Sequence, residues 1–238
     1  MSQTINSINM NSTSNTNNNK NGNLFIGIDG NIGSGKSTLL ETISVRYKNN
    51  PNVIILKEPL DIWDKVHDEN GNMLTHFYAD PKTHSFAFQI MALLSRYSIL
   101  KKVMTENTNK IIISERTLLT DKYVFAQMLH KQGNISDIHF QVYLQCFNEF
   151  AKDYPVDNII YVKTDPEICH LRIQKRARVG EEIIPLDYLN DCHQHHEEYL
   201  NDNSILNCAK LVLDGNTNIY KNEDVLNEWI QKIDDIIV

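Results

Sequence analysis

The feature that most constrains the fold is a short glycine-rich segment near the N-terminus, residues 30–37, which reads GNIGSGKS. It matches the pattern G-x-x-x-x-G-K-[ST] at every fixed position. The apolar run 24–28 precedes it and is long enough for one buried strand, and helix-compatible residues follow at 38–42. A strand, a glycine-rich turn and a helix start are the context in which this pattern forms a phosphate-binding loop. We therefore expect the chain to bind a nucleoside triphosphate.

The residue types of this segment suit phosphate binding. Its glycines let the backbone curl without Cβ clashes, so that successive N–H groups point at phosphate oxygens. The start of the following helix adds partial positive charge. Lys36 is expected to reach the terminal phosphates, and the Ser37 hydroxyl is placed to bind Mg²⁺. The expected triphosphate contacts are Gly30, Asn31, Ile32, Gly33, Ser34, Gly35, Lys36, Ser37 and Thr38.

Composition and charge limit the function classes. At 238 residues the chain suits one α/β domain with a sizeable core. A net charge of −7 argues against general electrostatic attraction to nucleic acid or to an anionic membrane. No apolar run approaches the roughly 18 residues that a membrane span needs. The cysteines are widely spaced without a C-x-x-C pair, which indicates free thiols in a reducing compartment.

The N-terminal segment, residues 1–22, is dominated by Asn, Ser and Thr. Such a segment cannot bury enough apolar surface to offset the entropy lost on ordering, so we expect a disordered tail at 1–22 and a single domain at 23–238. It lacks the apolar region of a secretory signal, and it has no Arg and no amphipathic helix typical of a mitochondrial transit peptide. A cytoplasmic location is favoured over a mitochondrial one.

Apolar runs and turn residues predict strands that alternate with helices. The expected strands are 24–28, 53–56, 110–114 and 158–162, with a last strand and its turn at 211–215. The expected helices are one that ends near 47, then 61–67, one that resumes at 73 after a turn at 68–72, 82–104, 118–130, 135–151, 164–175, 185–200 and 223–237. This order predicts an α/β fold with a five-stranded, open parallel sheet and helices on both faces.

Charged residues follow two of these strands. Glu58 comes after 53–56, and Glu115 with Arg116 comes after 110–114. Since α/β folds place their chemistry at the carboxyl ends of parallel strands, we expect a functional carboxylate at Glu58. The chain lacks an obvious Walker B strand, so Glu115 and Arg116 are expected to contact Mg²⁺ and phosphate.

Two more groups of polar side chains lie on predicted helices. Gln89 and Arg96 are seven residues apart, hence on one helix face, where an amide and a guanidinium can read the edge of a base. Arg172, Arg176 and Arg178 would repel one another near a helix end unless anions lie between them. That spacing is typical of a lid that closes over transferring phosphates.

A histidine cluster on the predicted helix 185–200 invites a metal interpretation. Its members are His193, His195 and His196, with Glu197 and Glu198 beside them. Mg²⁺ prefers oxygen ligands, and His193 and His195 point to different helix faces. His193 can share a helix face with His196 or Glu197, so a metal pair there stays open geometrically, but we expect a solvated helix face.

Five blocks of sequence together carry a family resemblance. They are residues 28–37, the EPL…W block at 58–63, the FAFQ…SR block at 86–96, the ERT…DKY block at 115–123 and the lid block at 172–186. In residue type, order and spacing they resemble the deoxynucleoside kinase family, specifically its deoxycytidine and deoxyguanosine kinase group. The resemblance covers roughly 23–238. Asp29 and Thr117 depart from it, standing where the family commonly has Glu and Ser, and both keep the chemistry.

The resemblance implies a P-loop kinase fold and ATP-dependent phosphorylation of a deoxynucleoside 5′-hydroxyl. Glu58 would be the general base that takes the hydroxyl proton, aligning the oxygen as well as accepting the proton. Arg116 would hold the 5′-oxygen and the transferring phosphoryl group, while Glu115 and Ser37 would hold Mg²⁺. Lys36 would act on the phosphates. The lid cations would be Arg172, Arg176 and Arg178.

For the acceptor, the resemblance implies that Tyr78 and Glu181 grip the 3′-hydroxyl, with Tyr78 also crowding C2′ and so favouring deoxyribose. The residues that would line the base pocket are Trp63, Phe77, Gln89, Arg96 and Asp121. The Arg96 and Asp121 pair argues against a dedicated thymidine enzyme. A purine deoxynucleoside, deoxyguanosine or deoxyadenosine, is favoured, with deoxycytidine as the alternative. Family members are usually homodimers.

Two other classes stay open. A nucleoside monophosphate kinase such as thymidylate kinase shares the phosphate loop and an arginine lid, but would be expected to have Asp-Arg at 115–116 and no Phe-Gln block. A nucleotide-switch protein would need an N-K-x-D motif. Asn109 and Lys110 are followed by two isoleucines instead.

Overall fold

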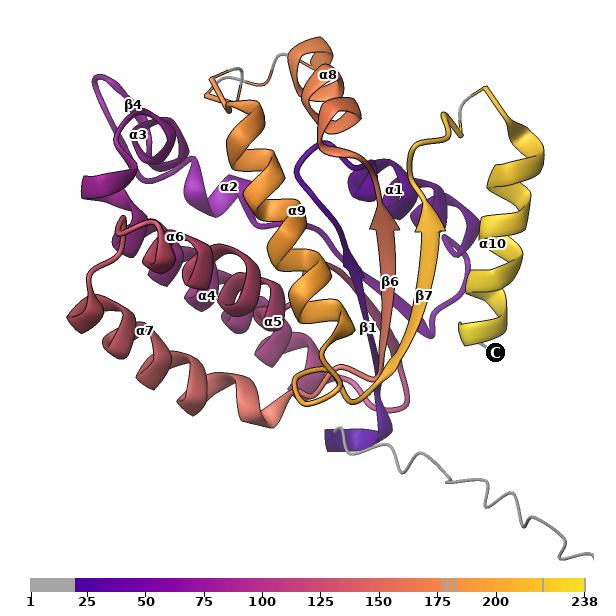
Figure 1. The fold of residues 1–238 in the computed structure, drawn as a ribbon. Helices are drawn as coiled ribbons and strands as arrows, with labels where there is room; N and C mark the ends of the chain where they lie inside the picture. The colour runs from indigo at the N-terminus through magenta and orange to yellow at the C-terminus, as the bar shows by residue number, and fades with distance from the viewer. Residues whose placement is uncertain (1–19, 177, 179, 182, 220, 238) are drawn as a thin grey trace, which may run out of the picture.

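The computed structural model describes part of the chain, namely residues 20–176, 178, 180–181, 183–219 and 221–237. Most of the segment 1–22, which the sequence predicts to be a disordered tail, lies outside the described residues (Figure 1). Its last residues, Lys20–Gly22, form one 3-10 turn, and the first strand begins directly after it, at Leu24.

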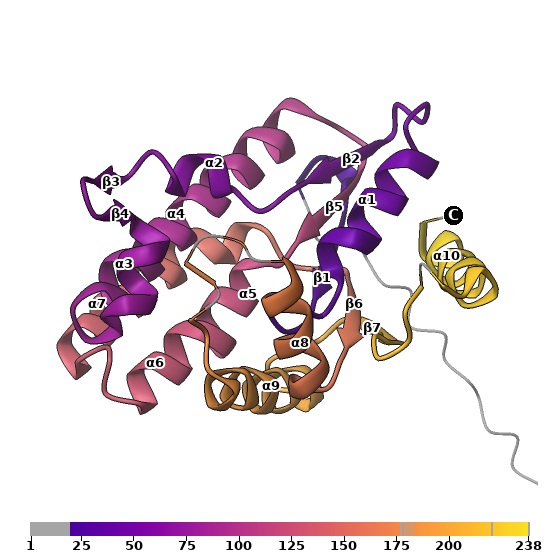
Figure 2. The same cartoon turned by 90° about the horizontal axis from the view of Figure 1, so that it is seen from above.

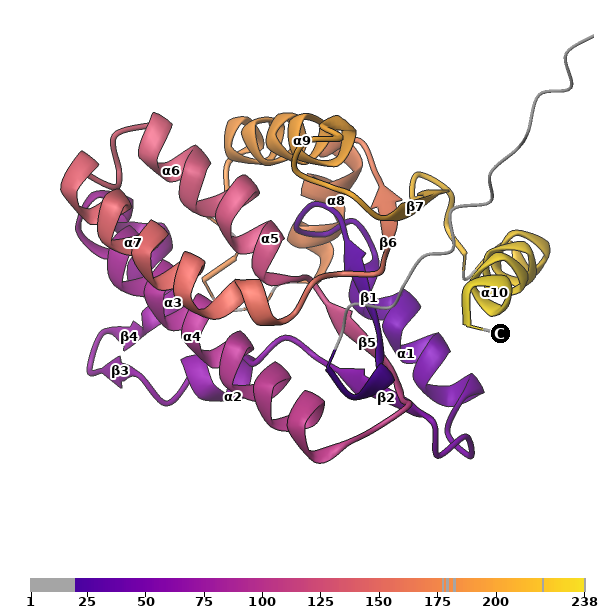
Figure 3. The same cartoon turned by 90° about the horizontal axis from the view of Figure 1, so that it is seen from below.

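Five parallel strands form the central sheet, in the order β2-β5-β1-β6-β7. β1 (Leu24–Asp29) lies in the middle between β5 (Ile111–Glu115) and β6 (Asn158–Lys163), while β2 (Val53–Leu56) and β7 (Ala209–Asp214) form the edges. Their runs of Ile, Leu and Val suit strands that are covered on both faces. Figure 3 shows the strands from below. The predicted five-stranded parallel sheet is confirmed.

Helices cover both faces of this sheet. α1 (Lys36–Arg46) and α10 (Glu223–Ile237) pack on one face through a core that includes Ile28, Leu40 and Trp229. The remaining helices lie mainly on the opposite face (Figure 1). They are α2 (Leu60–Trp63), α3 (Met73–Ala79), α4 (Pro81–Glu106), α5 (Leu118–Thr120), α6 (Gln127–Lys131), α7 (Asp137–Phe150), α8 (Pro166–Arg176) and α9 (Leu186–Asn201). Among the described residues, no helix is both long and apolar enough to span a membrane.

The helix predicted at 61–67 is wrong beyond its first turn. α2 ends at Trp63, and two-residue strands, β3 (His67–Asp68) and β4 (Gly71–Asn72), pair as a small hairpin. The Asp68 carboxylate accepts a hydrogen bond from the Asn70 backbone N–H at 2.8 Å, and Gly71 has φ 146°, a conformation that favours glycine. Turn chemistry therefore wins over helix formation in this segment.

The predicted helix 118–130 contains a change of helical type. A π-helical segment, Asp121–Ala126, separates α5 from α6. The Thr117 side chain begins this stretch by accepting a hydrogen bond from the Thr120 backbone N–H at 3.4 Å, and the Thr120 hydroxyl accepts one from the Thr117 backbone N–H at 3.2 Å. Because π-helical turns often occur at functional sites, the position of Asp121 at the start of this one draws attention to its side chain.

Candidate active site

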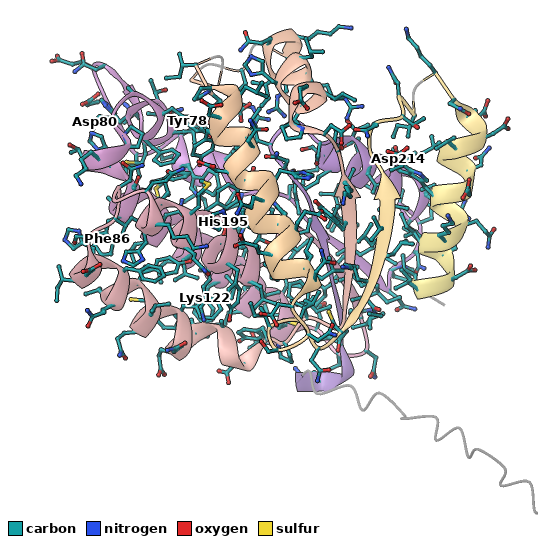
Figure 4. The ribbon with its side chains drawn as sticks, viewed as in Figure 1. Tyr78, Asp80, Phe86, Lys122, His195 and Asp214 are labelled. Atoms are coloured by element: carbon teal, nitrogen blue, oxygen red, sulfur yellow. The ribbon has the colours of Figure 1, made fainter. Side chains whose placement is uncertain are left out.

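A cavity of about 350 Å³ lies at the carboxyl edge of the sheet. Figure 2 looks onto this edge, with α1, α2 and α8 around the strand ends. The cavity extends from Tyr78 on α3 to Gly215, which follows Asp214 at the end of β7; Figure 4 labels Tyr78 and Asp214. The predicted site residues that line it are Ile32, Gly33, Ser34, Gly35, Lys36, Ser37, Thr38, Glu58, Trp63, Phe77, Tyr78, Gln89, Arg96, Glu115, Arg116, Asp121, Arg172, Arg176, Arg178 and Glu181.

The phosphate-binding loop has the conformation that its glycines predict. Gly33 has φ 78°, and a Cβ atom on it would lie 2.6 Å from the Cys169 carbonyl oxygen, so a larger residue has no room there. Gly30 and Asn31 do not line the cavity, and they shape the loop from behind. The Asn31 side chain donates to the Leu189 carbonyl oxygen at 2.8 Å, which ties the loop to α9.

Lys36 is buried at the start of α1, and its Nζ donates to the Asn31 carbonyl oxygen at 2.6 Å. Burial and the charge of Arg116 lower the pKa of Lys36 to about 8, against the opposing effect of the nearby carboxylates. The ammonium is therefore still protonated at neutral pH, and a bound phosphate would stabilise that charge further.

Glu58 and Arg116 form the centre of the cavity. Arg116 Nη1 donates to Glu58 Oε1 at 2.7 Å, and Arg96 Nη2 lies 3.4 Å from the same oxygen. Burial alone would raise the Glu58 pKa, but the positive charges of Arg116, Arg96 and Lys36 outweigh it and lower the pKa to about 2. Glu58 is thus a carboxylate at neutral pH and able to accept hydrogen bonds.

Arg116 has an unusual backbone. Its φ of 62° places a non-glycine residue in the left-handed region directly after β5. Such a conformation costs free energy and persists only where the surroundings enforce it, as they often do at functional sites. The carboxylates of Glu58 and Glu115 raise the pKa of Arg116 although burial opposes them. The guanidinium therefore stays charged beside Glu58.

Ser37 and Glu115 lie together, as the sequence predicts. The Ser37 hydroxyl donates to Glu115 Oε1 at 2.7 Å, joining the start of α1 to the end of β5. A hydroxyl and a carboxylate are hard oxygen donors of the kind that Mg²⁺ prefers, and they flank the phosphate-binding loop. The two residues present thus fit a magnesium ion bound to triphosphate. Among the described residues, no group of three or more His, Cys, Asp and Glu side chains forms a cluster that could hold a metal by itself.

Two of the three predicted lid arginines pair with one carboxylate. Arg176 forms a short ion pair with Glu181, and Arg178 Nη1 donates to Glu181 Oε1 at 3.0 Å. Arg172 Nη1 donates instead to the carbonyl oxygen of Ser34 in the phosphate-binding loop, at 3.0 Å. Glu181 therefore neutralises part of the lid charge in this structure, and all three arginines border the cavity.

The residues that the sequence predicts to read the base also line the cavity. Gln89 and Arg96 both point inward from α4, which confirms that they share a face. Arg96 Nε donates to Asp121 Oδ2 at 3.0 Å. Phe77 stacks on Phe88 with ring centroids 4.7 Å apart. This part of the cavity is therefore lined by stacked aromatic rings and by the buried ion pair of Arg96 and Asp121.

Several buried polar atoms that face this cavity have no hydrogen-bond partner among the described residues. They are Ser34 Oγ, Gln89 Oε1 and Arg116 Nε. Leaving a buried polar atom unpaired is costly, and most such atoms in native proteins find a partner. Ser34, Gln89 and Arg116 all line the cavity, so hydrogen-bonding capacity is left unused along its wall.

Sequence reasoning missed part of the cavity wall. At the base end these residues are Leu60, Leu74, Phe88, Ala92, Phe125 and Tyr188; near the lid and β7 they are Lys175, Gly215, Thr217, Asn218, Ile219 and Trp229. Phe88 and Ala92 share the helix face of Gln89, so spacing alone could have found them. The turn after β7 follows a strand end, the same signal that marks Glu58. Tyr188 and Trp229 give no comparable signal.

The solvated helix face predicted for the histidines is wrong for two of them. His195 is 7% exposed and His196 is fully buried on α9. A helix in a doubly wound fold buries one face, and the sequence pattern did not reveal that this face carries imidazoles.

Comparison with known proteins adds to this geometry. The family model described as "Deoxynucleoside kinase" matches residues 26–238. The probable deoxycytidine kinase of fowlpox virus is 38% identical over 185 residues, covering 75% of this chain and 72% of the viral protein. Deoxycytidine kinase 2 of Gallus gallus is 32% identical, with 89% and 88% covered. Human mitochondrial thymidine kinase 2 is 32% identical, with 78% and 68% covered.

Proposed function

We propose that deoxycytidine is the preferred acceptor of this chain, which belongs to the deoxynucleoside kinase family and is a deoxynucleoside kinase. This proposal replaces the purine preference expected from the sequence. Two of the relatives described above carry names that specify deoxycytidine, while the third names thymidine. The observation that carries the choice is the buried pair of Arg96 and Asp121 at the base end of the cavity.

The chemistry of base edges supports a cytosine. Cytosine offers an exocyclic amino donor, which a carboxylate accepts, whereas thymine offers a carbonyl acceptor at the same place. Asp121 would attract the first and repel the second. The unpaired Gln89 Oε1 adds a second acceptor close by, and small Ala92 lines the cavity on the same helix face. A purine with an exocyclic amino group shares part of this pattern, so adenine is the competing base.

The same geometry supports roles for the central residues. The 5′-oxygen forms a bond to the γ-phosphorus of ATP as the bond to the β–γ bridging oxygen breaks, and Glu58 accepts the hydroxyl proton. Arg116 Nη1, already bound to Glu58, holds the attacking oxygen and the phosphoryl group in line. Lys36 and the lid arginines stabilise charge on the phosphate oxygens. Tyr78 and Glu181, which both line the cavity, bind the 3′-hydroxyl.

Ser37 and Glu115 would hold Mg²⁺, which supplies charge neutralisation at the β- and γ-phosphates when bound. Their 2.7 Å hydrogen bond places both oxygens beside the phosphate-binding loop. The protein holds these two ligands together where the start of α1 meets the end of β5.

Mg-ATP should be offered with deoxycytidine, deoxyadenosine, deoxyguanosine, thymidine and their monophosphates. We expect the highest kcat/KM with deoxycytidine, no turnover of the monophosphates, and loss of activity when EDTA removes the metal. A higher kcat/KM for deoxyadenosine or deoxyguanosine would restore the purine assignment. Turnover of monophosphates only would contradict the roles given to Glu58 and Gln89.

We further propose that two copies of the chain form a homodimer. α7 carries two exposed apolar side chains one turn apart, Ile138 at 65% and Val142 at 44% exposed, and Leu94 on the neighbouring α4 is 39% exposed. Contiguous apolar side chains on a surface often mark a protein interface. In the dimer, α4 and α7 of one copy would pack against α4 and α7 of the other and so bury these apolar side chains.

Replacing Ile138 and Val142 together with Glu should convert a dimer of the wild-type chain into a monomer, because like charges would face each other across the interface. Analytical ultracentrifugation measures the change. Val45→Glu, at a 69% exposed site on α1, is the matched control and should leave the mass unchanged. A monomeric wild type, or a double variant that remains dimeric, contradicts this interface.

A further inference from the structure

A buried carboxylate lies directly behind the phosphate-binding loop. Asp29 is the last residue of β1, precedes Gly30, and is fully buried. Both of its oxygens accept from the Thr120 hydroxyl at 2.9 Å, and Oδ2 also accepts from the Tyr199 hydroxyl at 3.2 Å. Asp29 thus joins three elements: β1, which leads into the phosphate-binding loop, α5, which carries Thr120, and α9, which carries Tyr199.

His196 on α9 approaches the same carboxylate. Its ring is fully buried, and Nε2 lies 3.7 Å from Asp29 Oδ1. Its Nδ1 lies 2.7 Å from the Cys192 carbonyl oxygen. A carbonyl oxygen can only accept, so Nδ1 carries a proton. Nε2 has no hydrogen-bond partner among the described residues.

The protonation state of the ring follows from these contacts. If His196 were neutral with its proton on Nδ1, the lone pair of Nε2 would face a carboxylate oxygen, and the buried Asp29 anion would have the charge of Arg116 near it but no imidazolium beside it. If Nε2 is protonated, the imidazolium neutralises Asp29 and turns a repulsive contact into an ion pair. Burial raises the Asp29 pKa, but the His196 ring and the Thr120 hydroxyl lower it, so that the carboxylate is charged.

Other charged groups around His196 are engaged elsewhere. Glu197, its neighbour on α9, accepts from the Tyr161 hydroxyl at 2.8 Å and from Lys163 Nζ at 2.7 Å. The Tyr161 ring stacks beside His196 with centroids 6.1 Å apart, and the Phe125 ring meets it edge-on at 6.5 Å. The ring is therefore enclosed by aromatic faces from β6 and the π-helical segment, with Asp29 as its acidic neighbour on β1.

We propose that His196 and Asp29 form a buried ion pair whose role is to position the active site. Neither residue lines the cavity, so both act through others. Asp29 connects backbone next to the phosphate-binding loop with Thr120, one residue before Asp121 and four after Arg116. His196 supplies the charge that keeps Asp29 ionised and fixed to α9. The same helix accepts the hydrogen bond of the Asn31 side chain. The kinetic part of this inference rests on the proposed function; the ion pair does not.

The first test measures the charge of the ring in the wild-type protein. We expect ¹⁵N-histidine NMR at pH 7 to show both His196 nitrogens protonated, with assignment by the loss of that signal in His196→Phe. In Asp29→Asn, the neutral amide can donate to a bare Nε2, so His196 should lose its Nε2 proton. A neutral His196 in the wild type overturns the ion pair, whether or not the protein proves to be a deoxycytidine kinase.

The second test separates positioning from folding. His196→Phe takes the imidazolium away from Asp29, and we expect kcat to fall about tenfold with less than about threefold change in the nucleoside KM, since small misplacements of reacting groups act mainly on the chemical step. Adding Asp29→Asn removes the carboxylate charge and should restore kcat several-fold. His195→Phe is the matched control and should keep kcat, because among the described residues the His195 ring has no hydrogen bond or ion pair with a carboxylate and its Nδ1 lies 2.9 Å from the Asp191 carbonyl oxygen. An unchanged kcat in His196→Phe, or a double variant that is no better, overturns the positioning role; thermal melts verify that each variant is folded.

Discussion

Glu58→Gln is expected to lower kcat by about 10² or more, because a positioned proton acceptor contributes about 10²–10⁴-fold. The change keeps the shape of the side chain and one oxygen, but removes the carboxylate that takes the 5′-hydroxyl proton. It also weakens the contact with Arg116 Nη1 at 2.7 Å, which orients the guanidinium toward the phosphoryl group. The nucleoside KM should change much less, because the base and the 3′-hydroxyl are bound elsewhere in the cavity.

Steady-state kinetics with the nucleoside varied at saturating Mg-ATP would measure kcat and the nucleoside KM of the variant. Glu41→Gln is a suitable control, since Glu41 is an exposed carboxylate on α1 paired with Lys57. An unchanged kcat in Glu58→Gln would remove the assignment of Glu58 as the base.

The pH dependence of the wild-type enzyme gives an independent check on Glu58. Its pKa is lowered to about 2, so the carboxylate is ionised at every pH at which the protein is assayed. A group with a depressed pKa loses its charge only as the pH falls through that value. Loss of kcat/KM between pH 7 and pH 5 must therefore come from another group, and Glu58→Gln should leave the shape of the profile in that range unchanged.

Site residues could be predicted from the sequence where their chemical role requires a fixed spacing or a position at a strand end. The phosphate-binding loop is recognisable because its glycines and Lys36 have fixed spacing, and Glu58 and Arg116 are recognisable because they follow apolar strands. Parallel strands bring their carboxyl ends to one edge, so the fold gathers these residues without further information. Gln89 and Arg96 follow from helical spacing alone.

Other features depend on tertiary contacts and could not be read in this way. The burial of His196 depends on which face of α9 meets the sheet, and a helix with alternating imidazoles and carboxylates looks solvated in sequence. The hairpin after α2 arises because Asp68 and Gly71 favour a tight turn over one more helical turn. The wall residue Trp229 on α10 is far from every motif in sequence and reaches the cavity only because β7 places α10 beside α1.

Arg96→Met combined with Asp121→Ala is expected to invert the base preference toward thymidine. In the site proposed here, wild-type Asp121 would repel the thymine carbonyl oxygen, and the 3.0 Å ion pair with Arg96 fixes the carboxylate in place. Removing both partners leaves no unpaired charge from this pair at the base. Arg96→Met alone takes away the ion-pair partner of Asp121, whereas Asp121→Ala alone leaves Arg96 with Glu58, 3.4 Å away. Sites that are built on hydrogen bonds discriminate strongly, so the ratio of kcat/KM for thymidine over deoxycytidine should rise on the order of 10²-fold.

The comparison of the two nucleosides makes this prediction robust against a general loss of activity. Arg96 also donates to the Glu115 carbonyl oxygen at 2.7 Å and lies 3.4 Å from Glu58, so kcat should fall for every acceptor in the double variant. Such a loss cancels in the ratio, which reports the base pocket alone. Each single variant should lose activity with both nucleosides and gain less for thymidine than the pair does. A ratio that stays at its wild-type value would mean that base selection lies with Gln89 and the aromatic walls, and that Arg96 and Asp121 serve only to hold α4 against the π-helical segment.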